Sequence, residues 1–181
     1  MLTLTTGLCL WYVAHLFPAL AVSRRAGLIE RHGLRAYRAV FALWVVGALV
    51  LIVYGWRSTA PVAVYEPPAW GRAAAYVLGL PAFILFIAAK HTTNIKRWLR
   101  HPQLCGVILW SGAHLLANGD QRSLLLFSAL GFWALLEIVL INRRTGAWIK
   151  PEKVTPARDA VTLLAGRSEE HTSELQSHVR I

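Results

Sequence analysis

Long apolar stretches separated by short basic segments dominate the hydrophobic and polar pattern of this chain. Five windows are about as long as the roughly 20 apolar residues that cross a bilayer as a helix. They span residues 2–22, 36–56, 71–89, 99–118 and 122–141, and the fourth is the least apolar. The pattern therefore predicts an all-α fold: a polytopic transmembrane helix bundle of about five spanning helices.

Composition supports a membrane environment. Apolar residues make up 56% of the 181 positions and charged residues only 15%, whereas soluble domains carry about 25% charged residues. The eight Trp residues fit anchoring at membrane interfaces. The net charge of +10 would suggest nucleic acid in a soluble protein. Here the basic residues lie between apolar windows, so we expect the lipid bilayer and no nucleic acid as partner.

The basic segments alternate with segments that carry little charge. Residues 24–35, 90–100 and 143–158 are basic, whereas residues 57–68 and 118–120 are not. The positive-inside rule then predicts cytoplasmic basic loops and an amino terminus outside. No Lys or Arg precedes the first window, which therefore reads as an uncleaved helix and not as a signal peptide.

The last residues of the chain are polar and lack the helical period seen before them. Residues 167–179 read RSEEHTSELQSHV, which resembles the translation of a widely used sequencing adapter. We therefore expect residues 1–166 to form the transmembrane domain and residues 167–181 to be an artefactual, disordered tail. On this interpretation the native chain continues past Gly166, and a sixth helix begins near residues 160–164.

Three ionisable side chains fall inside the predicted helices: His15, His114 and Glu137. Such groups are costly in a bilayer and are candidates for function. Measured from the inner ends of their helices, they lie about 10, 18 and 6 Å deep at a rise of 1.5 Å per residue. His15 and Glu137 are thus expected at one level, with His114 somewhat higher.

Two helical imidazoles that face each other across a bundle can ligate haem iron axially. Helix tilt would offset the difference in depth between His15 and His114, and Glu137 would accept a hydrogen bond from the far nitrogen of His15. The alternative is that each histidine only hydrogen-bonds a neighbouring helix. Zinc is disfavoured because no third ligand lies at a comparable depth.

The central part of the chain carries a longer motif. Residues 100–120 read RHPQLCGVILWSGAHLLANGD, and a helix beginning SLLLF follows at Ser123. This run resembles the central signature of the NnrU family, and the first helix, with His15 before Phe17 and Pro18, fits the same family. The resemblance covers essentially all of residues 1–166.

The NnrU family is similar to the plant and cyanobacterial zeta-carotene isomerase, an integral membrane haem b enzyme. By this resemblance His15 and His114 match the histidines that ligate haem iron. The isomerase also has a cysteine, implicated in redox-dependent ligand switching, three residues before the second histidine. Ser111 stands there in this chain, so the resemblance does not carry over the switching mechanism, and it leaves open whether the protein is an enzyme.

NnrU-like proteins are bacterial inner-membrane proteins whose genes accompany nitrite and nitric oxide reductases. The resemblance therefore implies an inner-membrane location, a role in denitrification and nitric oxide metabolism, and partnership with that reductase system. A membrane haem there could sense nitric oxide, transfer electrons or catalyse an isomerisation.

Two other functions remain open from the residues. Arg100, His101 and Pro102, with Gly106 four residues later, also resemble the S-adenosylmethionine-binding motif of isoprenylcysteine methyltransferases. Those enzymes carry further acidic and basic residues on a following helix, whereas the close acid pair here is Glu169 and Glu170, in the discounted tail. The other alternative is a cofactor-free membrane assembly factor.

Overall fold

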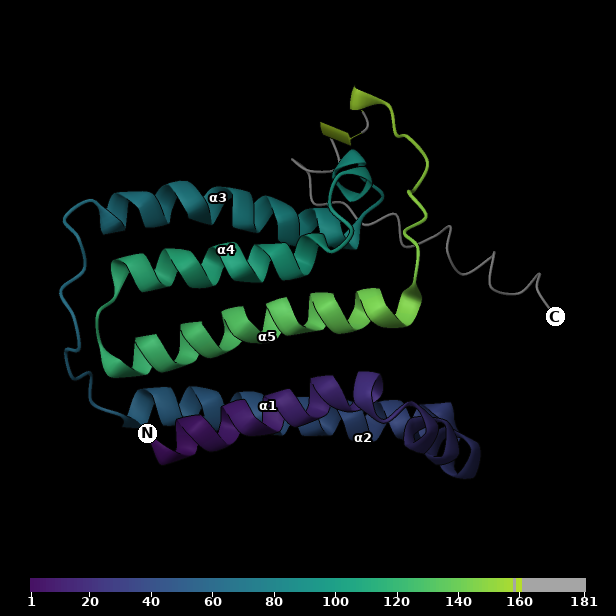
Figure 1. Cartoon of the computed structure of the whole chain (residues 1–181). Helices are drawn as coiled ribbons and strands as arrows, with labels where there is room; N and C mark the ends of the chain where they lie inside the picture. The colour runs from purple at the N-terminus through teal and green to yellow at the C-terminus, as the bar shows by residue number, and fades with distance from the viewer. Residues whose placement is uncertain (158, 161–181) are drawn as a thin grey trace.

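The computed structural model describes residues 1–157 and 159–160 and shows a bundle of roughly parallel and antiparallel helices (Figure 1). The elements in chain order are α1 (Leu2–Leu20), α2 (Val22–Ser58), α3 (Gly71–Lys90), the short 3₁₀ helix η1 (Asn94–Arg97), α4 (Pro102–Ala117) and α5 (Gln121–Thr145). The predicted all-helical membrane bundle is confirmed. The predicted tail at 167–181 and all but the first residue of the expected sixth helix lie outside the described residues.

Four of these helices, α1, α2, α3 and α5, are long and apolar enough to cross a membrane. The fourth predicted span is shorter than expected, because α4 has only 16 residues. Its length of about 24 Å falls short of the roughly 30 Å hydrocarbon core. Pro102 occupies the first turn of α4 and Asn118 is already extended, so the window at 99–118 includes residues that are not helical.

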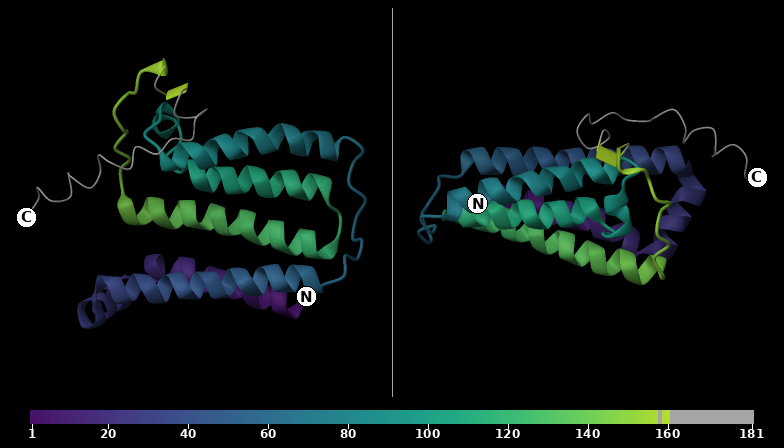
Figure 2. Two further views of the ribbon diagram at one scale, coloured as in Figure 1. Left: turned by 180° about the vertical axis from the view of Figure 1, so that it is seen from behind. Right: turned by 90° about the horizontal axis from the view of Figure 1, so that it is seen from above.

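The helices form two groups that meet on α5. Helix α3 packs on α4 and α4 on α5, while α1 packs on α2 and more lightly on α5. Figures 1 and 2 show the α1–α2 hairpin on one side of α5 and the α3–α4 pair on the other. The buried centre consists of Leu4 and Leu8 from α1, Ile52 from α2, and Leu126 and Phe127 from α5.

Small residues bring α1 and α2 into close contact. An added Cβ at Gly7 would lie 2.7 Å from the backbone nitrogen of Ile52, and one at Gly55 would collide with the backbone of Leu4. Without a hydrophobic driving force between helices in lipid, such close backbone packing is a main source of helix association. The hairpin therefore depends on these two glycines.

The first basic segment is helical, where we expected a loop between two spans. Helix α2 begins at Val22 and runs through the basic residues to Ser58, with one break at Gly33, where φ is 82° and ψ is 154°. Arg, Ala and Leu are good helix formers, so the residues before Gly33 continue as helix. Glycine adopts this positive φ without steric cost, and the chain bends there.

After α5 the chain folds back onto η1. The Asn94 side chain donates from Nδ2 to the Val154 carbonyl at 2.8 Å and accepts from the Val154 backbone N–H at 3.0 Å. Arg97 donates to the carbonyl of Pro151. The segment predicted as a polar connector is thereby fixed to the α3–α4 connection.

The amino end of α5 is capped by Asp120. Its Oδ1 accepts from the backbone N–H of Ser123 at 3.1 Å, and its Oδ2 accepts from the Ser123 hydroxyl at 2.5 Å. Arg122 lies 3.4 Å from Asp120 Oδ1 and donates to the carbonyls of Trp56 and Thr59. These bonds tie the start of α5 to the end of α2.

The first prediction concerns the α1–α2 contact. Gly7→Ala is expected to lower the stability by about 1–3 kcal/mol, because the new methyl group must displace the backbone of α2. Gly79→Ala is the matched control, since an added Cβ there meets no atom within 4 Å. Thermal unfolding in detergent micelles measures both, and equal stability of the two variants would contradict the close contact.

The second prediction concerns the cap of α5. Burial raises the pKa of Asp120, but hydrogen bonds from Ser123 and the nearby Arg122 charge outweigh it, so the pKa lies below its usual value. A lowered pKa in the folded state gives stability that is present above the unfolded value of about 3.9 and is lost as the pH falls through the folded pKa. Asp120→Ala is expected to cost about 1 kcal/mol at neutral pH.

Asp120→Asn distinguishes the effect of the capping hydrogen bond from that of the negative charge, because asparagine also caps helices well. This variant should keep most of the stability at neutral pH. It should not show the loss of stability that the wild type shows as the pH falls. Thermal unfolding between neutral pH and about pH 3 measures this difference. Identical acid sensitivity in wild type and Asp120→Asn would show that another carboxylate is responsible.

Candidate functional site

His15 lies in the second half of α1, half-buried in an aromatic environment. The Trp11 ring stacks on it at a centroid distance of 4.1 Å. Trp133 from α5 and Phe41 from α2 approach edge-on at 4.9 and 5.9 Å. Side chains from α1, α2 and α5 thus fix the position of this imidazole.

The hydrogen bond of His15 determines its tautomer. Nδ1 lies 2.9 Å from the carbonyl oxygen of Trp11. A carbonyl can only accept, so the neutral imidazole carries its proton on Nδ1 and its lone pair on Nε2. Within the described part of the chain, no group hydrogen-bonds Nε2. Histidines that ligate metals almost always have this arrangement, with the far N–H donated to a carbonyl or carboxylate.

His114 lies in the last turn of α4 and has different partners. Its ring stacks on Phe127 of α5 at 4.1 Å with an interplanar angle of 9°, and Trp110 approaches edge-on at 4.8 Å. The Asn118 amide nitrogen donates to the carbonyl of His114 at 2.9 Å and lies 3.5 Å from its Nδ1. An amide nitrogen only donates, so this weak contact favours the proton on Nε2, the opposite tautomer to that of His15.

The structure does not bring the two histidines together. His15 contacts Trp133 and His114 contacts Phe127. These residues lie six positions apart on α5, or about 9 Å along its axis. The main helix contacts of α1 are with α2 and α5, and those of α4 are with α3 and α5, so the two rings contact α5 at different levels.

Glu137 follows Trp133 by one helical turn, and only 7% of its surface is exposed. It therefore lies on the face of α5 that also carries the edge-on neighbour of His15. The Trp11 carbonyl, and not Glu137, accepts the hydrogen bond from His15 Nδ1. Residue types alone do not reveal this partner, because a backbone carbonyl has no residue signature, although the spacing of Trp11 and His15 by four places them in contact.

Buried polar groups without partners lie on the same helices. Across the described residues, Trp11 Nε1, Trp133 Nε1 and Ser111 Oγ are buried and make no hydrogen bond. The Ser111 side chain faces Gly131 of α5, where an added Cβ would lie 3.3 Å away. Unpaired donors are costly in a bilayer interior. These three groups therefore remain able to hydrogen-bond a partner inside the bundle.

Arg100 and His101 lie at the other end of α5. Arg100 donates to the Gly146 carbonyl and to the Thr145 hydroxyl. His101 Nε2 lies 2.9 Å from Asn142 Oδ1. These bonds join the start of α4 to the last turn of α5. They engage the guanidinium nitrogens of Arg100 and the Nε2 atom of His101.

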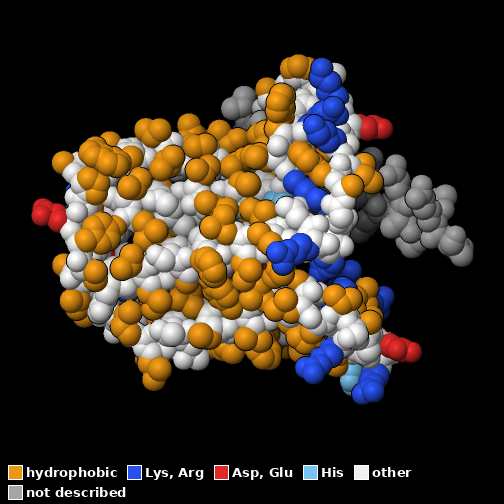
Figure 3. All heavy atoms as spheres, viewed as in Figure 1, with side chains coloured by type: hydrophobic (Ala, Val, Ile, Leu, Met, Phe, Trp, Pro, Cys, Tyr) orange, Lys and Arg blue, Asp and Glu red, His pale blue; other side chains and the backbone are white. Residues whose placement is uncertain are grey.

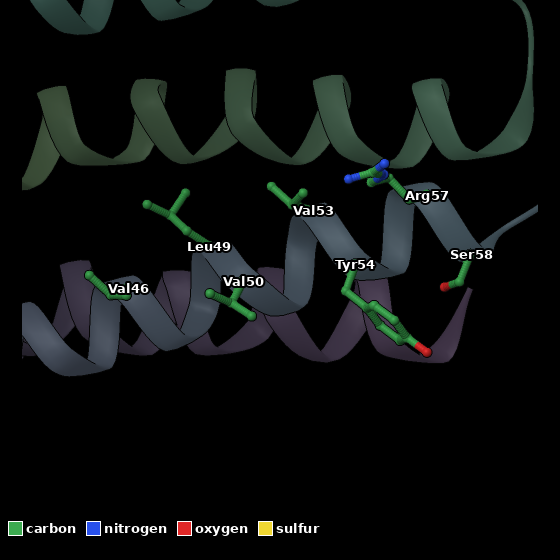
Figure 4. Close-up of a pocket in the computed structure, with 7 residues that line it drawn as sticks. All are labelled: Val46, Leu49, Val50, Val53, Tyr54, Arg57 and Ser58. Carbon is green, nitrogen blue, oxygen red and sulfur yellow. The ribbon is translucent and has the colours of Figure 1, made fainter.

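An apolar groove of about 610 Å³ runs along α2, apart from both histidines. Figure 4 shows its side chains along one side of α2, several of them directed toward a neighbouring helix. The groove is lined by Val46, Leu49, Val50, Val53, Tyr54, Arg57 and Ser58. In a bilayer such a surface is open to lipid. None of the residues that line the groove is a His, Cys, Asp or Glu that could bind a metal ion.

The chain is a polytopic helical membrane protein: it has long apolar helices, basic segments between them and ionisable residues within them. The chain belongs to the NnrU family, because the family model described as NnrU protein matches residues 3–168. Comparison with curated proteins found no match. Comparison with solved structures also found none.

The third prediction tests the role of Arg100. Arg100→Gln is expected to lower the melting temperature by several degrees, because it removes charge-assisted bonds that hold the end of α5. Lys90→Gln removes the same charge at the nearby end of α3 and is the matched control, with little expected effect.

The same assay addresses the methyltransferase alternative. A ligand that binds only the folded state raises the melting temperature. We expect S-adenosylmethionine to leave the wild-type value unchanged, because side-chain nitrogens of Arg100 and His101 already bond α5. A rise that disappears in Arg100→Gln would instead identify a methyltransferase-like site.

Proposed function

We propose that this NnrU-family protein binds haem b in the bacterial inner membrane, with His15 as the axial ligand, and supports nitric oxide metabolism in denitrification. The observation that carries the proposal is the tautomer of His15. Its Nδ1 is bonded to the Trp11 carbonyl, which leaves the Nε2 lone pair free inside an apolar, aromatic environment. This is the donor chemistry that haem iron takes from a proximal histidine.

The pair of histidines fits haem less well than His15 alone. Ligation by both would require the two rings to hold one haem together, whereas Figure 1 shows α5 between the two helices that carry them. We therefore propose one protein ligand. If His15 alone held haem b, the haem would supply the chemistry for binding a small molecule such as nitric oxide.

The chain's own residues would orient the ligand and exclude water. The Trp11 carbonyl fixes the direction of His15, and the rings of Trp11, Trp133 and Phe41 cover it from three helices. Glu137, buried one turn from Trp133, would influence the charge near this site. An apolar, water-poor surrounding stabilises the neutral imidazole required of a ligand.

We further propose that the amino terminus lies outside and the basic end faces the cytoplasm. Figure 3 shows Lys and Arg side chains gathered at one end of the bundle and apolar side chains along most of its length. This distribution supports the orientation through the positive-inside rule. A functional partnership with nitrite and nitric oxide reductases is proposed from the family resemblance alone.

The fourth prediction separates the two histidines. The full chain is purified in detergent with haem supplied in excess, and its pyridine haemochrome spectrum is recorded. His15→Ala is expected to lose at least nine-tenths of the bound haem, because no other group takes its place. His114→Ala should retain most of it, and the exposed His32→Ala is the matched control.

Each outcome of this experiment is informative. A colourless wild type would overturn the haem proposal and favour a cofactor-free assembly factor. Loss of haem in both His15→Ala and His114→Ala would overturn the single-ligand proposal in favour of two-histidine ligation. A change of the haem absorption bands on titration with nitric oxide would support the proposed binding of nitric oxide.

A further inference from the structure

The first part of α2 is a separate short helix between two breaks in the backbone. Ala21 leaves the helical region with φ −118° and ψ 51°, and Gly33 does so with φ 82° and ψ 154°. A straight helix of the 37 residues of α2 would be about 55 Å long, far more than the roughly 30 Å hydrocarbon core. The break at Gly33 leaves residues 34–58 as the spanning part and residues 22–32 as an 11-residue helix outside it.

A contact across the break shows how far the short helix turns. The Arg25 guanidinium lies 5.6 Å from the centre of the Tyr37 ring. Residues twelve apart on a straight helix are separated by about 18 Å along the axis. The short helix is therefore bent back at Gly33, and the cation–π contact holds the bend.

The two sides of this helix differ in chemistry. Val22, Ala26 and Ile29 fall on one stripe at a period of 3.6 residues. Arg24 and Arg31, seven residues apart, fall on the opposite side together with Leu28, and all three are exposed. Val22 is also 52% exposed and Ala26 is exposed, whereas Ile29 is partly buried, so the rest of the described chain leaves most of the stripe uncovered.

The basic side is free to bind anions. Within the described residues neither Arg24 nor Arg31 forms an ion pair, because the single salt bridge there joins Arg122 and Asp120. Arg35 and Arg38 follow directly after the break and add to the positive charge. Figure 3 shows basic side chains at the end of the bundle where this helix lies.

We propose that residues 22–32 form an interfacial helix that binds anionic phospholipids. Its stripe of Val22, Ala26 and Ile29 lies in the acyl-chain boundary, and Arg24 and Arg31 bind headgroup phosphates. An amphipathic helix with one apolar and one basic side adopts this position at a membrane surface. Each basic residue near an anionic surface adds attraction for it. The helix would thereby fix the α1–α2 turn at the level of the headgroups.

The fifth prediction tests lipid selectivity on the full chain. Native mass spectrometry in detergent measures binding of phosphatidylglycerol and of phosphatidylcholine. The double variant Arg24→Gln/Arg31→Gln is expected to bind phosphatidylglycerol about 30-fold more weakly, the change that corresponds to losing two interfacial charges. Binding of phosphatidylcholine should not change.

The matched control removes the same charge elsewhere on the same end of the protein. Lys150→Gln/Lys153→Gln lies in the exposed segment after α5 and should reduce phosphatidylglycerol binding less than threefold. Equal losses in both double variants would show a general charge effect and overturn the proposal. Unchanged binding in Arg24→Gln/Arg31→Gln would overturn it as well.

A second measurement tests the position of the helix without changing its charges on the basic side. In a background with Cys9→Ser and Cys105→Ser, single cysteines are placed by Ile29→Cys and Glu30→Cys. In liposomes that contain phosphatidylglycerol, a membrane-impermeant maleimide should react at least tenfold faster at position 30 than at position 29. Equal rates, measured in permeabilised liposomes so that both sides are reached, would contradict an interfacial helix.

Discussion

Packing against α5 is the constraint on which the rest of the bundle depends. The α1–α2 hairpin and the α3–α4 pair meet through this helix, and its buried Phe127 and Trp133 contribute to the contacts on both sides. The capping of α5 by Asp120 and the bonds of Arg122 to the end of α2 fix its amino end. At its other end, Arg100 holds the last turn. Because α5 occupies the middle of the bundle, it also determines where each intramembrane histidine can lie.

The same packing gives the two histidines different chemistry. His15 donates a hydrogen bond from Nδ1 to a backbone carbonyl within α1 and keeps a free lone pair on Nε2, whereas His114 lies flat on Phe127 with a weak contact to the Asn118 amide. Two residues that look equivalent in the sequence thus differ as ligands, since the proton position on one ring nitrogen decides what the other can bind. Family membership supplies the class of protein, and this local hydrogen bond is the reason for proposing His15 as the haem ligand.

The sequence predicted the fold well where long apolar runs decide the outcome. The windows that became α1, α3 and α5 coincide closely with the observed helices, because helices are the structures that satisfy backbone polar groups in lipid. The bend at Gly33 and the early start of α2 were missed, since a basic segment reads equally well as loop or as surface helix. His15, His114 and Glu137 were correctly placed within helices. Their separation by α5 depends on which helices are neighbours, and hydropathy carries no information about that order.

The spin state of the iron in the haem-loaded wild-type protein is the most direct test of the central claim that α5 keeps His15 and His114 apart. Electron paramagnetic resonance of the ferric protein distinguishes one axial imidazole from two. A predominantly high-spin signal is predicted, as expected for a single histidine ligand with a weak or absent partner. A low-spin signal of two axial imidazoles would contradict the account and require α1 and α4 to meet across one macrocycle.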